Sequence, residues 1–223
     1  MAKMRAKRLL DVGLSGLALA ALSPLLAATS AAIVLESRGR VLFRQERVGK
    51  GKTRFEVIKF RTMYHRDPSS IDQRAEAVVS SNADARITRV GRLLRITSID
   101  ELPQLVNVLR GDMSLVGPRP VLPAQLEAIP EERMTRFDVP PGLTGLAQVR
   151  GRRSLDWLEQ LEADAEYVGR QSLGLDLVII ARTVLVLATA SGIYGDASRN
   201  WRNYIREDKA TSGGAEPLRA ESA

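Results

Sequence analysis

An uncharged apolar run near the N-terminus is the strongest constraint on how this chain can fold. Residues 12–35 contain no Asp, Glu, Lys or Arg and lie between Asp11 and Glu36. A straight helix of this length measures about 36 Å, which exceeds the roughly 30 Å of a bilayer's hydrocarbon core. A basic start precedes the run, as in a secretory signal, but the run is too long for the apolar core of one. We therefore expect a membrane helix here.

The residues around and within this run predict that the helix returns to the side from which it entered. Lys or Arg occurs on both flanks, at positions 3, 5, 7 and 8 before the run and at 38, 40, 44, 47, 50, 52 and 54 after it. The positive-inside rule disfavours exporting either flank. Pro24 removes a helical hydrogen bond near the middle, and the Ser23 hydroxyl can satisfy a carbonyl freed there. We expect a re-entrant helix over residues 1–37, broken at Ser23-Pro24; the alternative is a single-pass anchor with a tolerated proline.

Composition limits the chemistry and the partners. The chain has no cysteine and one histidine, which excludes disulfides, a thiol nucleophile and a thiolate or His-rich zinc site. A net charge of +7 favours anionic partners such as phosphates, nucleotides or an acidic lipid surface. The aromatic content of 4% disfavours stacking of single-stranded nucleic acid. We expect no nucleic-acid partner, and chemistry that rests on carboxylates, hydroxyls, amides and cations.

The remaining sequence predicts one cytosolic domain of the α/β class, mainly helical with a short β-hairpin. Apolar residues over 41–60 predict two strands about a turn at Gly49 and Gly51. We expect the domain to cover residues 38–206. The small, polar residues 207–223 predict a disordered tail.

Two further helices are expected towards the C-terminus. Residues 155–170 predict an amphipathic helix with one apolar side, formed by Leu155, Leu158, Leu161 and Ala165. Residues 173–194 are strongly apolar but contain Asp176 and Arg182, which make a second span costly. This segment is therefore expected to be a buried or interfacial helix, and the sequence does not give it a role.

Two adjacent carboxylates, Asp100 and Glu101, begin a helix predicted in "SIDELPQLVNVLRGD". Ser98 and Glu101 match a capping box; alternatively Asp100 is the N-cap, and Pro103 then occupies a position whose N–H is not needed. With either start, free amides and the helix dipole favour negative charge, so both carboxylates should be ionised. The same place can receive a phosphate or a metal-bound pyrophosphate. Plain N-capping without chemistry remains the alternative.

Cationic side chains surround these carboxylates in sequence. Arginines at 86, 89, 92 and 95 recur every three residues, as on a solvated helix face or a phosphate site. Arg119 lies between two prolines in "VGPRP"; they restrict its backbone and suit bidentate phosphate recognition. The glycine-rich "PPGLTGLAQVRGRRS" carries Arg150 and Arg152 and can close over an anionic ligand, or it is a basic loop without one.

Taken together, four stretches resemble the monotopic bacterial sugar transferases, also called polyprenol-phosphate phosphoglycosyl transferases. They are "KRLLDVGLSG…SP", "VLFRQERVGKGKTRFEVIKFRTM", "TSIDELPQLVNVLRGDMSLVGPRP" and "PGLTGLAQVRGR", in unbroken order over roughly residues 7–205. The resemblance implies the small catalytic form of the family. It also implies a monotopic protein whose re-entrant helix, bent at Ser23-Pro24, enters and leaves through the cytoplasmic leaflet of the bacterial inner membrane.

The resemblance further implies an activity. A sugar-1-phosphate would move from a UDP-sugar to polyprenol (undecaprenyl) phosphate, with release of UMP, through a covalent aspartyl-phosphosugar intermediate. This would be the first membrane step of bacterial glycan assembly, with downstream glycosyltransferases as possible partners. The sequence decides neither the sugar, nor the glycan, nor the oligomeric state. A non-catalytic basic scaffold tethered to the membrane is the alternative function, and a membrane-anchored nucleic-acid binder is the least favoured.

Roles for individual residues also follow from the resemblance. Asp100 would be the nucleophile and a ligand of Mg²⁺, with Glu101 as its partner. Because an anion attacks an anionic phosphate in this reaction, positive charge is needed nearby. The candidates that supply it by binding substrate or phosphate are Lys59, Arg61, Arg95, Arg119, Arg150 and Arg152.

Overall fold

The computed structural model describes residues 2–65, 84–151, 154–189 and 201–205. The helices are α1 (Ala2–Glu36), α2 (Arg89–Thr97), α3 (Leu105–Arg110), α4 (Leu146–Arg150), α5 (Trp157–Arg170) and α6 (Leu173–Thr189), with a further helical segment at 201–205. The strands are β1 (Leu42–Val48), β2 (Arg54–Phe60), β3 (Ser114–Val116) and β4 (Gly142–Thr144). Short 3₁₀ segments are η1 (Lys50–Lys52), η3 (Ile99–Gln104), η4 (Pro123–Ala128) and η5 (Glu131–Phe137). The expected class, mainly helical with a short hairpin, is confirmed.

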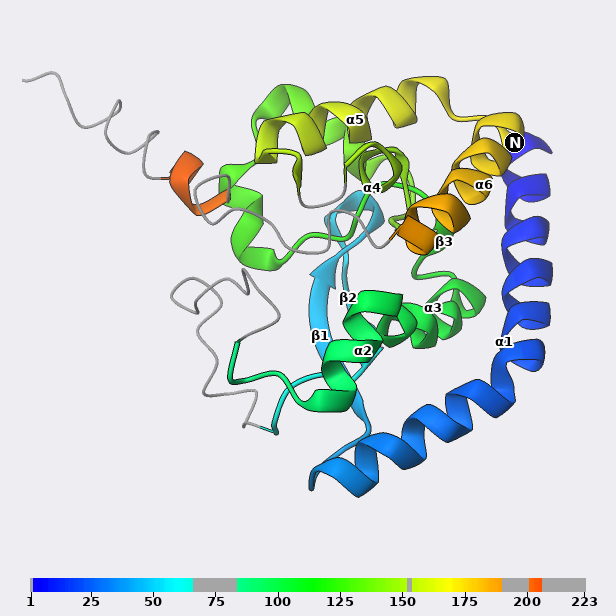
Figure 1. Ribbon diagram of the computed structural model, residues 1–223. Coiled ribbons are helices and arrows are strands. Elements are labelled where there is room, and N and C mark those ends of the chain that lie inside the picture. Colours follow the sequence, from blue (N-terminus) through cyan, green and yellow to red (C-terminus); the bar gives the residue numbers. More distant parts are fainter. Residues whose placement is uncertain (1, 66–83, 152–153, 190–200, 206–223) are drawn as a thin grey trace, which may run out of the picture.

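The β1–β2 hairpin lies in the middle of the globular part, with α2 and α3 on one side and α4 and α5 on the other (Figure 1). The strands pair antiparallel from Leu42 opposite Phe60 to Val48 opposite Arg54. The turn falls where the sequence predicted it, and Gly51 has a φ of 61°, which favours glycine. A second pairing, parallel between β3 and β4, was not predicted from the sequence.

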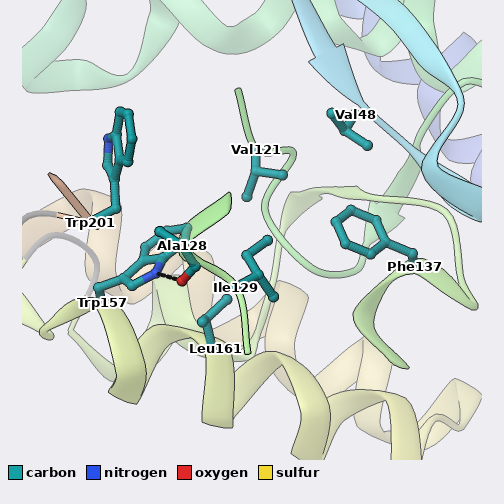
Figure 2. Close-up of a cluster of buried hydrophobic side chains, with 8 residues drawn as sticks. All are labelled: Val48, Val121, Ala128, Ile129, Phe137, Trp157, Leu161 and Trp201. Carbon is teal, nitrogen blue, oxygen red and sulfur yellow. Dashed lines mark hydrogen bonds between the residues drawn. The ribbon is translucent and has the colours of Figure 1, made fainter. Parts of the chain in front are cut away.

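Both halves of the globular part pack against this hairpin. Val48 at the end of β1 belongs to a cluster that also contains Val121, Ile129, Phe137 and residues of α5. Figure 2 shows Trp157 and Leu161 rising from α5 towards this cluster, and the Trp157 indole donates a 2.8 Å hydrogen bond to the Ala128 carbonyl. Towards the other half, Phe60 of β2 packs with Leu94 of α2 and Ile33 of α1. The hairpin is thus held from both sides.

The buried side of α5 agrees only in part with the expected one. Leu161 is buried as expected, whereas Leu158 was expected on the same side but is 43% exposed. The helix begins after Leu155, because Asp156 is the N-cap and accepts a hydrogen bond from the Glu159 amide. The packed side also contains Trp157, Asp164 and Tyr167, which the spacing of the leucines did not predict.

The long helix α1 bends but stays helical across the proline. Figure 1 shows the bend about midway along α1, and Pro24 lies inside the continuous helix. Pro24 cannot donate to the Ala20 carbonyl four residues earlier, and the Ser23 hydroxyl donates to it instead at 2.9 Å. The expected break is therefore wrong in detail, because this hydroxyl replaces the lost hydrogen bond.

Both ends of α1 are attached to the same globular part. Near its start, Lys7 forms a 2.7 Å ion pair with Asp176 of α6, and Asp11 accepts hydrogen bonds from the Ser114 hydroxyl and the Leu115 amide. At its end, Glu36 accepts hydrogen bonds of 2.6 and 2.9 Å from the first two amides of α2. A straight helix of this length measures about 52 Å. The bend lets both of its ends contact one domain.

The apolar surface of α1 is largely uncovered. Its exposed residues include Leu9, Leu17, Val34 and Leu35, and the segment Met4–Glu36 is long and apolar enough to cross a membrane. Uncovered apolar surface of this extent is typical of membrane association. The neighbouring α6 buries Asp176 and Ile179 on one side and exposes Leu177, Val178, Val184 and Leu185 on the other. The tail predicted at 207–223 lies outside the described residues.

Candidate active site

Asp100 and Glu101 lie in η3, a 3₁₀ segment between α2 and α3. Ser98 ends α2 in the left-handed conformation with a φ of 57° and makes no side-chain cap to η3. Ser98 is the N-cap residue of η3, so the predicted start at Ser98 is observed but without its capping box, whereas Asp100 lies inside η3 and is not an N-cap. Pro103 is accommodated inside the same segment. Because η3 is a short 3₁₀ segment, side chains and not a helix dipole determine the charge of these two carboxylates.

Two cations bind one oxygen of Glu101. Lys59 Nζ from β2 lies 2.9 Å from Glu101 Oε1, and Arg119 Nη2 lies 3.0 Å from the same atom. Burial alone would raise the pKa of Glu101, but Lys59 and Arg119 outweigh burial and hold this pKa well below its usual range. In return, Glu101 raises the pKa of Arg119. Glu101 is therefore ionised at every physiological pH, as expected.

Asp100 is in a different state. No hydrogen bond or ion pair joins its carboxylate to any residue in the described part of the chain. Burial, followed by the charge of Glu101, raises the pKa of Asp100 to about 6. Three nearby cations oppose this rise in pKa, namely Lys59, Arg95 and Arg119. At neutral pH Asp100 is mainly ionised, and no other described residue binds its oxygens.

The side chain of Asn107 joins α3 to β2 and so brings Lys59 to Glu101. Asn107 is fully buried; its Oδ1 accepts a 3.1 Å hydrogen bond from the Ile58 amide, and its Nδ2 donates a 2.7 Å bond to the Glu56 carbonyl. These two backbone groups lie just before Lys59 in the strand. Helix α3, which follows the two carboxylates, is thus fixed to β2, the strand that carries Lys59.

Arg119 is positioned through its backbone as well as by its two prolines. The buried Arg136 of η5 donates a 2.6 Å hydrogen bond from Nη2 to the Arg119 carbonyl. The same Nη2 lies 2.9 Å from Asp164 Oδ2 of α5. Burial raises the pKa of Asp164 to about 6, against the opposing charge of Arg136. The arginine that binds Glu101 is therefore linked to α5.

The other predicted cations do not all lie near the carboxylate pair. Arg95 lies near Asp100, and its Nε donates a 3.1 Å hydrogen bond to Thr62 Oγ1. Arg61 is buried and donates to the Ser37 and Arg38 carbonyls at the end of α1. Arg150 pairs with Glu166 of α5 at 2.6 Å. Arg152 lies outside the described residues. The structure therefore brings Lys59, Arg95 and Arg119 together around the carboxylates, whereas Arg61 and Arg150 make these contacts elsewhere.

The donor set can be compared with what Mg²⁺ requires. Among the described residues, no group of three or more His, Cys, Asp or Glu could enclose a metal ion. Mg²⁺ nevertheless commonly uses only one or two carboxylates, together with water and substrate phosphates. Asp100 offers such a carboxylate, since its oxygens have no protein partner in the described chain. These residues fit a Mg²⁺ that is completed by substrate, and they do not fit a closed protein site.

A family comparison can now be set beside this geometry. The model of the family described as "Bacterial sugar transferase" matches residues 2–190, which include α1 and the carboxylate pair. The chain belongs to the bacterial sugar transferase family. The resemblance seen in the motifs is thereby confirmed.

Curated relatives in the bacterial sugar transferase family cover most of this chain. A UDP-glucose:undecaprenyl-phosphate glucose-1-phosphate transferase of Caulobacter vibrioides is 46% identical over 196 residues, which are 84% of this chain and 72% of the relative. An undecaprenyl-phosphate glucose phosphotransferase of Komagataeibacter xylinus is 45% identical over 192 residues, 81% of this chain and 35% of the relative. A UDP-N-acetylgalactosamine-undecaprenyl-phosphate N-acetylgalactosaminephosphotransferase of Aeromonas hydrophila is 39% identical over 192 residues, 83% of this chain and 44% of the relative.

Sequence reasoning missed several residues that build this site. Asn107 and Gln104 are polar residues within an apolar helical pattern, a signal that can indicate buried polar contacts. Arg136 and Asp164 gave no local signal, because each resembles a charge on a solvated helix. Arg47 lies in the predicted hairpin, and its contact with the Pro120 carbonyl joins residues far apart in sequence.

Proposed function

We propose that this protein transfers a sugar-1-phosphate from a UDP-sugar to polyprenol phosphate and releases UMP. One observation carries the proposal: Lys59 and Arg119 are bound to Glu101, whereas the adjacent Asp100 carboxylate has no partner among the described residues. An ionised and available carboxylate beside cations is suited to attack on a phosphoryl group. The names of two relatives include UDP-sugars, and those of all three include undecaprenyl phosphate. The reaction would be the first membrane step of bacterial glycan assembly.

The proposed reaction has two displacements at one phosphorus atom. An Asp100 oxygen attacks the β-phosphorus of the UDP-sugar and forms an aspartyl-phosphosugar, while the bond to the bridging oxygen breaks and UMP leaves with the electron pair. A phosphate oxygen of the polyprenol phosphate then attacks the same phosphorus. The bond to Asp100 breaks, and the free carboxylate is regenerated with the polyprenyl-diphosphate sugar.

The surrounding side chains have distinct tasks in this scheme. Lys59 and Arg119 hold Glu101 ionised and, with Arg95, provide the positive charge that lets an anionic carboxylate approach an anionic phosphate. Glu101 orients its two cations. Mg²⁺, held by Asp100 and substrate oxygens, would neutralise charge on the diphosphate when bound.

The membrane arrangement follows from α1. Its uncovered apolar middle is suited to the bilayer, while its two ends contact one globular domain. We propose a re-entrant helix in the cytoplasmic leaflet of the bacterial inner membrane, with residues 38–206 in the cytosol. There the domain meets a cytosolic nucleotide sugar and a lipid phosphate at the same surface. The donor sugar is left open, because relatives are named for both glucose and N-acetylgalactosamine.

The test is UMP release by the purified protein in membrane discs with polyprenol phosphate, Mg²⁺ and a panel of UDP-sugars. We expect one or a few sugars to support release. Asp100→Asn should abolish it, and intact-mass analysis should find a phosphosugar adduct on the wild type but not on this variant. Asp138→Asn is a matched control that changes an exposed carboxylate outside the site. Full activity of Asp100→Asn would exclude Asp100 as the nucleophile, and no release with any UDP-sugar would favour a non-catalytic membrane scaffold.

A further inference from the structure

A small cavity adjoins the carboxylate pair on the side of its two cations. It contains about 240 Å³ of empty space, part of it open to solvent, and its polar lining is formed by Arg47, Lys59, Gln104 and Arg119. The rest of the lining comes from apolar side chains, proline and glycine. Among the described residues, three cationic side chains and no carboxylate contribute to this lining. Such a wall is suited to an anion.

The buried amide of Gln104 is the unusual feature of the cavity. Gln104 is 3% exposed, and its Nε2 has no hydrogen-bond partner in the part of the chain that the structure describes. A buried amide donor without an acceptor is unfavourable, and such groups in folded proteins commonly bind water or a ligand. In a 3₁₀ segment, side chains three residues apart lie on the same side. Gln104 therefore projects from the same side of η3 as Glu101, whose cations line the cavity.

The charge of the cavity lining favours a phosphoryl group. Lys59 and Arg119 each reach both Glu101 and the cavity. Arg47, which donates to the Pro120 carbonyl and to Gln45 Oε1, is the third cationic side chain of the lining. An anion in the cavity could therefore contact Lys59 and Arg119 while both remain paired with Glu101.

We infer that this cavity binds a phosphoryl group of a substrate and that Gln104 Nε2 donates a hydrogen bond to one of its non-bridging oxygens. The inference rests on the proposed function and adds a substrate-binding residue to it. Gln104, as a neutral donor, contacts the oxygen without requiring a further counterion. The phosphoryl group belongs either to the nucleotide sugar or to the polyprenol phosphate, and kinetics can distinguish these sources.

The experiment measures kcat/KM separately for the UDP-sugar and for polyprenol phosphate in Gln104→Leu and Gln104→Glu. Loss of a hydrogen bond to a charged group should lower kcat/KM by about 10- to 100-fold in Gln104→Leu. Gln104→Glu should lose more, because its carboxylate repels the phosphoryl group. A loss confined to the UDP-sugar identifies the donor phosphate, and one confined to polyprenol phosphate identifies the acceptor. Gln160→Leu is the matched control, since it removes from α5 an amide donor that binds the Leu155 carbonyl outside the site.

Binding of inorganic pyrophosphate gives a measurement that does not depend on turnover. We expect pyrophosphate to raise the Tm of the wild type and of Gln160→Leu, and to raise it much less in Gln104→Leu and in the more conservative Gln104→Met. Equal Tm shifts together with kcat/KM values within about threefold of wild type would overturn the inference. A wild type that releases no UMP but shows the Gln104-dependent Tm shift would instead count against the proposed function alone.

Discussion

The guanidinium of Arg136 and the carboxylate of Asp164 lie 2.9 Å apart, and each side chain is only 3% exposed. This pair joins η5 to α5 behind the backbone of Arg119. Its two members respond differently to loss of the partner. Asp164 has a pKa raised by burial to about 6 and can become neutral by taking up a proton, whereas arginine stays charged.

Asp164→Leu should therefore destabilise the protein more than Arg136→Met does. Leaving a buried cation uncompensated costs about 3–5 kcal/mol, which corresponds to a fall in Tm of more than about 6 °C for a domain of this size. Arg136→Met leaves a carboxyl group that can be protonated, together with the Arg119 carbonyl without its donor. The double variant should melt above Asp164→Leu. Thermal melting in membrane discs at pH 7 makes the comparison, and a lower Tm for Arg136→Met would contradict it.

Local patterns in the sequence were sufficient for some parts of the fold and site. Alternating apolar residues and the glycine turn predicted the hairpin. Short motifs contain the carboxylates and the cations, so both could be named as site residues from the sequence. Local patterns could not predict the contacts that support the site. Asn107 acts through β2 and Arg136 through α5, so their roles depend on packing between segments about 50 and 28 residues away in sequence. The bend of α1 was expected, but the continuity of the helix depends on one hydroxyl.

Asn107→Leu should uncouple the carboxylate pair from Lys59. The substitution keeps the approximate volume but leaves the Ile58 amide and the Glu56 carbonyl without their partners. Each buried unsatisfied group costs about 1–3 kcal/mol, so we expect a lower Tm and a fall in activity of at least tenfold. Asn107→Asp tests the two bonds separately, because it retains the acceptor for Ile58 and removes the donor to Glu56. Activity equal to wild type in Asn107→Leu would show that the two Asn107 hydrogen bonds do not position Lys59.

Gly142→Ala should be strongly destabilising because neighbouring backbone atoms leave no room for a Cβ at this position in β4. A Cβ at this position would overlap the backbone nitrogen of Gly117 and the carbonyl oxygen of Thr144. Neither backbone atom can move without disrupting the parallel pairing. We expect a loss of more than about 2 kcal/mol, measured as a fall in Tm. Gly169→Ala is the control: it lies in α5 with open space around it, and it should raise stability by up to about 1 kcal/mol.

The arrangement of α1 predicts where labels can reach its two ends. Arg5 and Arg40 are exposed and flank the apolar segment, and the chain contains no native cysteine, so Arg5→Cys and Arg40→Cys each provide a single labelling site. A re-entrant helix keeps both positions on the cytoplasmic side. A membrane-impermeant maleimide should therefore label neither position in intact cells and both in permeabilised cells. Labelling of position 5 from outside intact cells would refute the re-entrant arrangement.

Pro24→Leu extends this test to the cause of the bend. Leucine restores the amide that donates to Ala20 and removes the steric reason for bending, so a straight helix becomes long enough to span the bilayer. The contacts of Lys7 and Asp11 oppose this change, because they hold the start of α1 to the globular domain. We therefore expect a fraction of the Arg5→Cys/Pro24→Leu molecules, rather than all of them, to become labelled from outside. Adding Lys7→Met should increase that fraction. Ser23→Ala keeps the proline and serves as the control, in which labelling should stay at the background level.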